Sequence, residues 1–285
     1  MTRIQLAFGP CEVHLDGNPD APAMLLVHNT LVNASVWDPI VPTLAERYRV
    51  IRPDLPIGAH DIPVEDRSVL HPDGIADALA ELLDALGVDQ VAVAGSDTGG
   101  ALAQIFTARH PDRVNALVLL SCDVLDHFPP TVLKPVQPLL AVPFLVDLAA
   151  QPFRWRFMRR SPAGAGLLLN KPIDDAVIDP WFDRFVGHKF VRRDTAAFLR
   201  RCRPAQARAA AARLAELDLP VLFAWSKGDR IFPESDARKL HAMLRRSRLE
   251  FVDGARSFAQ IDRPAAVLDL VLPFLQEVNA ARAGA

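Results

Sequence analysis

One short segment of the chain combines a reactive side chain with the residues that a tight turn needs. Asp97 lies in the middle of Val91-Ala-Val-Ala-Gly-Ser-Asp-Thr-Gly-Gly100, with Gly95 and Gly99 two residues away on either side. Small residues at these places let a strand turn abruptly into a helix and expose the central side chain on strained backbone. The N–H groups of the helix N-terminus favour negative charge there. The segment therefore predicts a nucleophile elbow with Asp97 as the nucleophile.

Two other interpretations of this segment are weaker. With Ser96 as the nucleophile, the flanking residues at the same spacing are Ala94 and Thr98, which fit a sharp turn less well. Alternatively, the glycines serve only the packing of a strand against a helix. The spacing of the glycines favours Asp97 over both.

The rest of the chain alternates between apolar strands and amphipathic helices. A hairpin is expected over 4–8 and 12–15, and further strands over 23–27, 49–52, 116–120, 220–225, 249–252 and from 91 to the elbow. Helices are expected over 37–48, from 75 until Gly87 stops it, from the elbow to 110, and over 233–244 and 267–278. Apolar strands separated by helices predict an α/β fold with a parallel sheet covered on both faces.

A long segment interrupts this alternation between 123 and 217. It opens with a proline-rich stretch and continues with helical patterns, and from Gln151 to Arg213 it has 14 Lys or Arg against five Asp. An insertion between two core strands at the reactive edge predicts a helical cap (123–217) over a pocket in a core made of 1–122 and 218–285. Its positive charge fits an anionic substrate or, more commonly, solvated helix faces.

Composition excludes several classes of function. The 285 residues carry a net charge of −2, which gives no sign of a nucleic-acid partner. The N-terminus lacks the apolar core of a secretion signal, and the longest apolar run, near Pro143, is too short to span a bilayer. The three cysteines have no disulfide or zinc spacing. We expect a cytoplasmic protein that acts on a small molecule and needs no metal, cofactor or membrane partner. The sequence leaves open whether the protein forms a homodimer.

Taken together, these segments resemble the α/β-hydrolase fold along nearly the whole core. Gly95-Ser-Asp-Thr-Gly99 is similar to the branch with aspartate nucleophiles, which includes haloalkane dehalogenases and epoxide hydrolases. His28-Asn29-Thr30 resembles the oxyanion loop, with asparagine at the usual glycine, and Arg52-Pro-Asp-Leu-Pro-Ile-Gly58 resembles the turn after the fourth strand. Trp225-Ser-Lys-Gly-Asp229-Arg-Ile-Phe-Pro233 resembles the segment that carries the triad acid.

The resemblance implies a mostly parallel eight-stranded sheet with helices on both faces and a helical cap insertion. It implies Asp229 as the triad acid, although Asp123 and Asp126 after the sixth strand compete for that role. It also implies that His28 supports the oxyanion loop, and that the backbone N–H groups of Asn29 and Thr98 stabilise an anion.

The chain departs from the family pattern at the catalytic histidine. In the family this histidine lies in a Gly-x-x-His-Phe context after the eighth strand, whereas the matching residues here are Gly254-Ala-Arg-Ser257-Phe258. No histidine follows His241. Serine cannot deprotonate the water that hydrolyses an alkyl-enzyme ester, so that step is expected to slow by about 10²–10⁴-fold.

Three outcomes remain open for such a site. A histidine from another loop replaces the missing base, the enzyme performs chemistry that needs no base, or the pocket binds without turnover. His60, in Gly58-Ala-His60-Asp61, is the preferred substitute because its loop ends at the same sheet edge, and His127 is a weaker one.

The chain lacks residues that the family uses for particular substrates, and these absences argue against some substrate classes. Epoxide hydrolases of this branch use cap tyrosines, but the only tyrosine here is Tyr48, far from the cap. Dehalogenases have tryptophan after the nucleophile, where this chain has Thr98; Trp155 and Trp181 lie in the cap, where core packing is their more usual role. The leading hypothesis is a hydrolase of a small organic substrate with a non-standard triad. The alternatives are a lyase or cyclase, or a ligand-binding protein.

Overall fold

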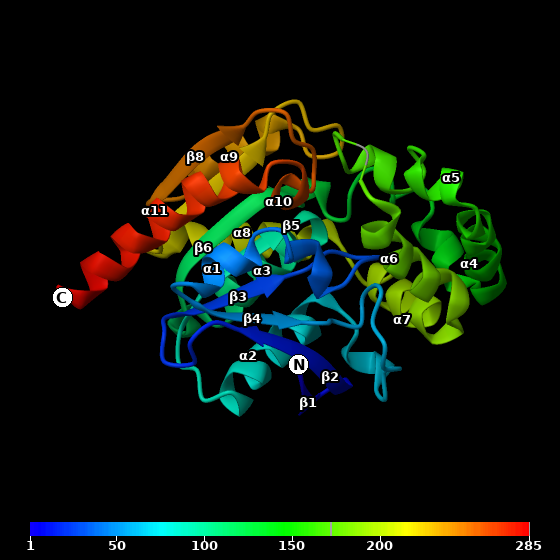
Figure 1. Ribbon diagram of the computed structural model, residues 1–285, viewed down its shortest axis with the longest axis horizontal. Helices are drawn as coiled ribbons and strands as arrows, with labels where there is room; N and C mark the ends of the chain where they lie inside the picture. Colours follow the sequence, from blue (N-terminus) through cyan, green and yellow to red (C-terminus); the bar gives the residue numbers. More distant parts are fainter. Residues whose placement is uncertain (172, 285) are drawn as a thin grey trace.

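The computed structural model describes residues 1–171 and 173–284. Eight strands form one sheet in the order β1-β2-β4-β3-β5-β6-β7-β8 (Figure 1). Strand β2 pairs antiparallel with both of its neighbours, and all other pairs are parallel. The strands are β1 (Thr2–Leu6), β2 (Gly9–Asp16), β3 (Ala23–Val27), β4 (Arg49–Pro53), β5 (Val91–Ser96), β6 (Val114–Cys122), β7 (Val221–Ser226) and β8 (Ser247–Val252). The predicted α/β-hydrolase architecture is confirmed.

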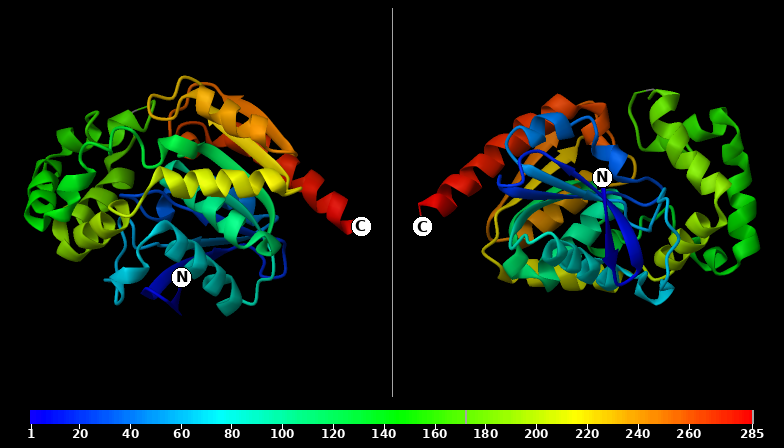
Figure 2. Two further views of the ribbon diagram at one scale, coloured as in Figure 1. Left: turned by 180° about the vertical axis from the view of Figure 1, so that it is seen from behind. Right: turned by 60° about the horizontal axis from the view of Figure 1, so that its bottom comes forward.

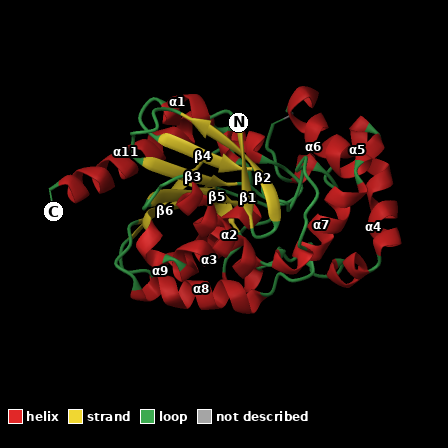
Figure 3. Cartoon of the chain, turned by 90° about the horizontal axis from the view of Figure 1, so that it is seen from below, coloured by secondary structure: helices red, strands yellow, loops and turns green. Residues whose placement is uncertain are grey.

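Helices cover both faces of this sheet (Figure 3). Helices α2 (Pro72–Ala85), α3 (Asp97–Arg109), α8 (Pro204–Glu216) and α9 (Glu234–Met243) contribute to one hydrophobic cluster. Helices α1 (Val41–Ala45), α10 (Ala259–Asp262) and α11 (Pro264–Ala283) contribute to the other. Strand β3 is apolar throughout because Leu25 and Val27 face the first cluster while Met24 and Leu26 face the second.

Most of the segment between β6 and β7 lies beyond the carboxyl ends of the parallel strands, at the opposite end of the molecule from the C-terminus of α11 (Figure 2). Besides α8, which packs on the core, its α-helices are α4 (Pro143–Ala150), α5 (Arg156–Arg160), α6 (Asp175–Gly187) and α7 (Lys189–Leu199). Its 3-10 helices are η4 (Leu125–His127), η5 (Gln137–Ala141), η6 (Gln151–Arg154) and η7 (Ala165–Leu167), while η1 (Ala34–Trp37), η2 (Arg67–Val69) and η3 (Pro111–Arg113) lie elsewhere.

The structure differs from the sequence-based expectation in the packing of one helix and in the continuity of another. Helix α8, assigned above to the insertion that ends at 217, packs against α3, and its Ala207, Ala211 and Leu214 belong to the core cluster. The single helix expected over 37–48 is instead η1 followed by α1. Pro39 and Pro42 lack the N–H groups that a continuous helix would need there.

No described helix combines the length and apolar character that crossing a membrane requires.

Candidate active site

The turn between β5 and α3 places its backbone strain at Asp97. This residue has a φ of +50°, whereas Ser96 is extended with a φ of −129°. A Cβ on Gly95 would lie 2.4 Å from the Gly99 oxygen, and one on Gly99 would lie 2.2 Å from the Val27 oxygen. Both flanking positions therefore require glycine, as the elbow centred on Asp97 predicts.

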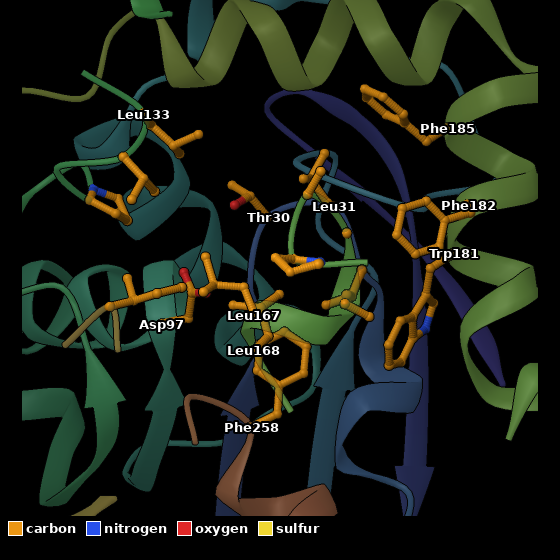
Figure 4. Close-up of a pocket in the computed structure, with 18 of the residues that line it drawn as sticks. Thr30, Leu31, Asp97, Leu133, Leu167, Leu168, Trp181, Phe182, Phe185 and Phe258 are labelled. Carbon is orange, nitrogen blue, oxygen red and sulfur yellow. The ribbon is translucent and has the colours of Figure 1, made fainter. Parts of the chain in front are cut away.

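A cavity of about 180 Å³ opens beside Asp97, between the sheet edge and the insertion (Figure 4). Among its lining residues Asp97 is the only ionisable one, and Thr30 supplies the only hydroxyl. The rest are Leu31, Val32, Pro130, Val132, Leu133, Phe153, Pro162, Ala163, Gly164, Ala165, Leu167, Leu168, Trp181, Phe182, Phe185, Ile231 and Phe258. One acid in an apolar enclosure is suited to reaction with an apolar molecule.

The two carboxylate oxygens of Asp97 have different surroundings. Oδ1 accepts hydrogen bonds from the Thr98 backbone N–H and from Thr98 Oγ1, the latter at 2.9 Å. Oδ2 receives no hydrogen bond from the described residues. Burial raises the pKa of Asp97 to about 6, with the charge of Asp229 adding to the shift, although the Thr98 hydrogen bonds oppose it. At neutral pH most molecules therefore carry an ionised Asp97 with one uncommitted oxygen.

A second buried carboxyl lies behind Thr98. Thr98 Oγ1 is 3.4 Å from Asp123 Oδ2, and burial together with the Asp97 charge raises the pKa of Asp123 well above its ordinary value. This shift favours the protonated form of Asp123, which would donate to Thr98 Oγ1 and leave the hydroxyl proton of Thr98 for Asp97. Sequence spacing suggested Asp123 only as a competing triad acid. Asp126, the other competitor, is exposed and pairs with Arg208.

Asp229 and Ser257 are in contact, as the triad pattern predicts. Ser257 Oγ is fully buried and donates to Asp229 Oδ1 at 3.2 Å, and the same oxygen accepts from the N–H groups of Ile231 and Phe232. Burial raises the pKa of Asp229. Its Oδ2 is buried without a described hydrogen-bond partner. The contact joins the two residues that the family pattern assigns to the acid and histidine positions, but it supplies no imidazole.

The loop after β3 presents Thr30, rather than Asn29, to the cavity. The Asn29 side chain accepts a hydrogen bond from Ser96 Oγ at 3.0 Å and is fully buried. His28 Nε2 accepts from the Leu55 N–H at 2.7 Å, and its Nδ1 contacts the Asn29 oxygen. Burial lowers the pKa of His28, so a neutral ring donates from Nδ1 and holds the loop. Thr30 was missed because the sequence pattern alone does not show which loop residue turns inward.

The serine alternative is not supported by the position of Ser96. Its Oγ is fully buried, donates to Asn29 and accepts from Gln260 Nε2 at 3.1 Å. Ser96 is absent from the cavity lining.

The structure does not bring the proposed substitute bases to Asp97. None of the eight histidines lines the cavity. His60 uses both ring nitrogens elsewhere, with Nδ1 3.0 Å from the Gly58 oxygen and Nε2 3.3 Å from Asp194 Oδ2 on α7. His127 Nδ1 lies 2.6 Å from Asp236 Oδ2. The expectation that the loop of His60 would deliver it to the site was wrong, because the ring turns toward α7.

The two tryptophans of the insertion have different environments. Trp181 lines the cavity, but its Nε1 donates to Ser35 Oγ at 2.8 Å and so is not free for an anion. Trp155 is 60% exposed, so the core-packing role expected for it was wrong. Among the residues that the structure describes, no cluster of three or more His, Cys, Asp or Glu is placed to hold a metal.

Characterized and uncharacterized bacterial proteins are similar in sequence to this chain. An uncharacterized Mycobacterium tuberculosis protein is 27% identical over 278 residues, covering 91% of this chain and 77% of that protein. The 2-hydroxy-6-oxononadienedioate/2-hydroxy-6-oxononatrienedioate hydrolase 2 of Pseudomonas putida is 27% identical over 265 residues, covering 90% of this chain and 88% of its own.

Solved structures share the fold at lower identity. An ancestral haloalkane dehalogenase has a TM-score of 0.80 at 20% identity, covering 98% of this chain and 100% of its own. A 2-hydroxy-6-oxo-6-phenylhexa-2,4-dienoate hydrolase from a Rhodococcus strain has a TM-score of 0.76 at 21% identity, covering 96% and 97%. A family model described as alpha/beta hydrolase fold matches residues 22–264, so this chain belongs to the α/β-hydrolase fold family.

Proposed function

We propose that the protein is a hydrolase-type enzyme in which Asp97 displaces a leaving group from a carbon atom of a small apolar substrate. The observation that carries this proposal is the state of the Asp97 carboxylate. It is the only ionisable group that lines an apolar cavity, and it has one oxygen held by Thr98 and one without a described donor. Hydrolases among the named relatives support the same broad class of reaction.

The chemical step follows from this asymmetry. A lone pair of Oδ2 forms a bond to the substrate carbon, the bond from that carbon to the leaving group breaks, and the leaving group departs as an anion with the electron pair. Oδ1 becomes the carbonyl oxygen of an alkyl ester. The N–H and hydroxyl of Thr98 already donate to Oδ1, so they would stabilise the negative charge that forms there when water attacks the ester.

The cavity limits the leaving group and the size of the substrate. The only hydroxyl of the described lining, that of Thr30, is a far weaker acid than a tyrosine phenol. Tyr48 is buried in the hydrophobic cluster that includes α1, α10 and α11 and does not line the cavity. A halide or another stable anion therefore fits better than an epoxide oxygen. A cavity of about 150 Å³ accommodates benzene, so the 180 Å³ here suits a molecule of that size or slightly larger.

Hydrolysis of the ester lacks its usual base. Ser257 stands at the sequence position of the family histidine, and its hydroxyl donates a hydrogen bond to Asp229. Loss of a general base slows such a step by about 10²–10⁴-fold. We therefore expect the alkyl-enzyme ester to accumulate.

The proposal is tested by halide release from short alkyl bromides and chlorides. Wild-type protein is expected to release one equivalent of halide per chain in a burst and then to turn over slowly. Asp97→Asn keeps the shape of the side chain and should abolish the burst. Epoxides of matched size should give little reaction. A wild type that releases no halide, or an Asp97→Asn variant with an undiminished burst, contradicts the proposal.

One observation favours a second candidate, a lyase or cyclase. Asp123, Thr98 and Asp97 form a chain of hydrogen-bonding groups that ends at the cavity and could pass a proton to or from a substrate. This chemistry would consume substrate without a burst and without an adduct on Asp97. Saturable binding that Asp97→Asn leaves unchanged, with no turnover, would instead indicate a binding protein.

A further inference from the structure

Large apolar side chains project into solvent from the outer end of the insertion. We call Leu139, Val142, Phe144, Leu148, Trp155 and Phe157 the outer patch; each is between 45% and 71% exposed. They come from η5, α4, the end of η6 and α5, and α4 and α5 lie at the end of the molecule opposite the C-terminus (Figure 1). Exposed apolar groups that gather in this way mark an interaction surface.

The elements that carry the outer patch contact one another. Helix α4 contacts η5 and η6, and η6 contacts α5. Phe144 and Leu148 are one helical turn apart and so share a face of α4, while the rings of Trp155 and Phe157 stack with centroids 6.3 Å apart. The other exposed large apolar residues of the core, such as Leu15 and Met243, come from separate elements.

The charges around the outer patch identify the kind of partner. Residues 128–171 contain six basic residues and a single acid, Asp147, which pairs with Arg192. Exposed bases of this stretch are Lys134, Arg154, Arg156, Arg160 and Lys171. Arg156 and Arg160 pair with Asp179 and Asp175 of α6, so the positive charge without an acidic partner among the described residues comes from Lys134, Arg154 and Lys171. A second copy of this chain docked about a two-fold axis would bring these like charges face to face. An anionic surface would attract them.

We propose that the outer patch docks on the surface of an anionic lipid bilayer. Tryptophan and phenylalanine beside arginine are the residues that settle at the boundary between headgroups and acyl chains. The sequence predicted no membrane partner because that expectation rested on the absence of a spanning segment, whereas peripheral docking needs only a few exposed side chains. Docking does not depend on the chemistry of Asp97.

The outer patch is also connected to the cavity. Phe153, two residues before Trp155, lines the cavity, and Val132 lines it while being 56% exposed. Docking would therefore bring the cavity wall next to the acyl chains, where apolar molecules concentrate. This second step rests on the proposed function and narrows its substrates to lipophilic ones.

Co-sedimentation with vesicles tests the docking. The full chain is mixed with vesicles of phosphatidylcholine alone or of phosphatidylcholine with phosphatidylserine. We expect binding to the anionic vesicles that weakens with added salt. The double variant Trp155→Ser, Phe157→Ser should bind about tenfold less tightly or worse, and Arg154→Ala should bind about fivefold less tightly.

Matched variants separate docking from folding and from activity. Leu15→Ser and Met243→Ser also remove exposed apolar side chains but should leave binding unchanged, and circular dichroism melting confirms that every variant is folded. Asp97→Asn should bind vesicles like the wild type even if halide release fails. Absence of binding by the wild type, or equal binding by the double variant, overturns the proposal. A wild-type dimer that the double variant converts to a monomer, without vesicle binding, assigns the patch to a second copy instead.

Discussion

Asp97 combines two unfavourable features in one residue. Its backbone has a positive φ, and its carboxylate is buried against apolar walls. Neither feature helps the chain to fold, and residues of this kind concentrate where a reactive group must be held ready. The positive φ could be predicted from Gly95 and Gly99. The burial of the carboxylate could not, because the cavity walls come from residues far along the chain.

The buried charge of Asp97 should make stability depend on pH. The folded-state pKa is raised from 3.8 to about 6, so the folded protein binds more protons than the unfolded chain between these values, and stability falls as pH rises through this window. Asp97→Asn should therefore be more stable than the wild type at neutral pH, by up to about 3 kcal/mol. The difference should vanish below 3.8, where the carboxyl is protonated in both states. Urea unfolding at several pH values measures this, and an equal difference at every pH would contradict it.

Ser257 is the residue at which a base can be restored. Ser257→His places an imidazole beside Asp229, so decay of the ester on Asp97 should accelerate by about 10²–10⁴-fold. The decay is followed by intact mass after excess substrate is removed. Ser257→Ala is the control, because it removes the contact with Asp229 and adds no base. A folded histidine variant whose ester persists as long as in the wild type would show that the missing base is not the reason for accumulation.

Much of the site was visible as residue types at the right spacing. Asp97, Asp229 and Ser257 follow strands whose ends meet at one edge, so their neighbourhood follows from the topology. Thr30 and the Thr98–Asp123 contact do not, because they depend on how individual side chains turn after the strand ends.

At the scale of elements, the approach of α3 to β3 depends on Gly99. A Cβ there would lie 2.2 Å from the Val27 oxygen, so Gly99→Ala should destabilise the protein by about 1–3 kcal/mol or more. Gly187→Ala is the control, since a Cβ at that position meets nothing within 4 Å. Thermal and urea unfolding of the two variants give the comparison. Equal stability of both variants would mean that the elbow can relax without cost.

The elements themselves were predicted best where burial fixes the pattern. Strand β3 was predicted at its observed bounds, because both of its faces are covered and every position is apolar. The prediction of one helix over 37–48 was wrong because it followed the apolar spacing and neglected Pro39 and Pro42, which interrupt a continuous helix. The alanine-rich pattern of α8 shows a helix but not the surface that it covers, so its packing on α3 could not be foreseen.

At the scale of the whole molecule, a buried polar cluster joins the insertion to the core. Asp194 on α7 is fully buried and accepts hydrogen bonds from the Val64 N–H and Arg67 while contacting His60. His60, which the sequence analysis preferred as a substitute base for the active site, is therefore part of this cluster instead. The cluster fixes the insertion above the cavity, so it bears on the shape of the site without contacting substrate.

Asp194→Ala should therefore weaken the attachment of the insertion to the core and lower the free energy of unfolding. It leaves His60 and the Val64 N–H without their partner, and breaking such a buried pair costs about 3–5 kcal/mol. Asp61→Ala, which removes an exposed ion pair between the core and Arg184, should cost less than about 1 kcal/mol. Urea unfolding measures both, and similar losses for the two variants would contradict a special role for Asp194.

The central claim is that Asp97 is a nucleophile toward carbon. Intact mass spectrometry of the protein after incubation with a short alkyl bromide, followed by peptide mapping, tests it most directly. The claim predicts a mass gain of one alkyl group less one hydrogen, located on the peptide that contains Asp97 and absent from Asp97→Asn. Unmodified wild-type protein across the alkyl halides, or an adduct that maps to another residue, would contradict it.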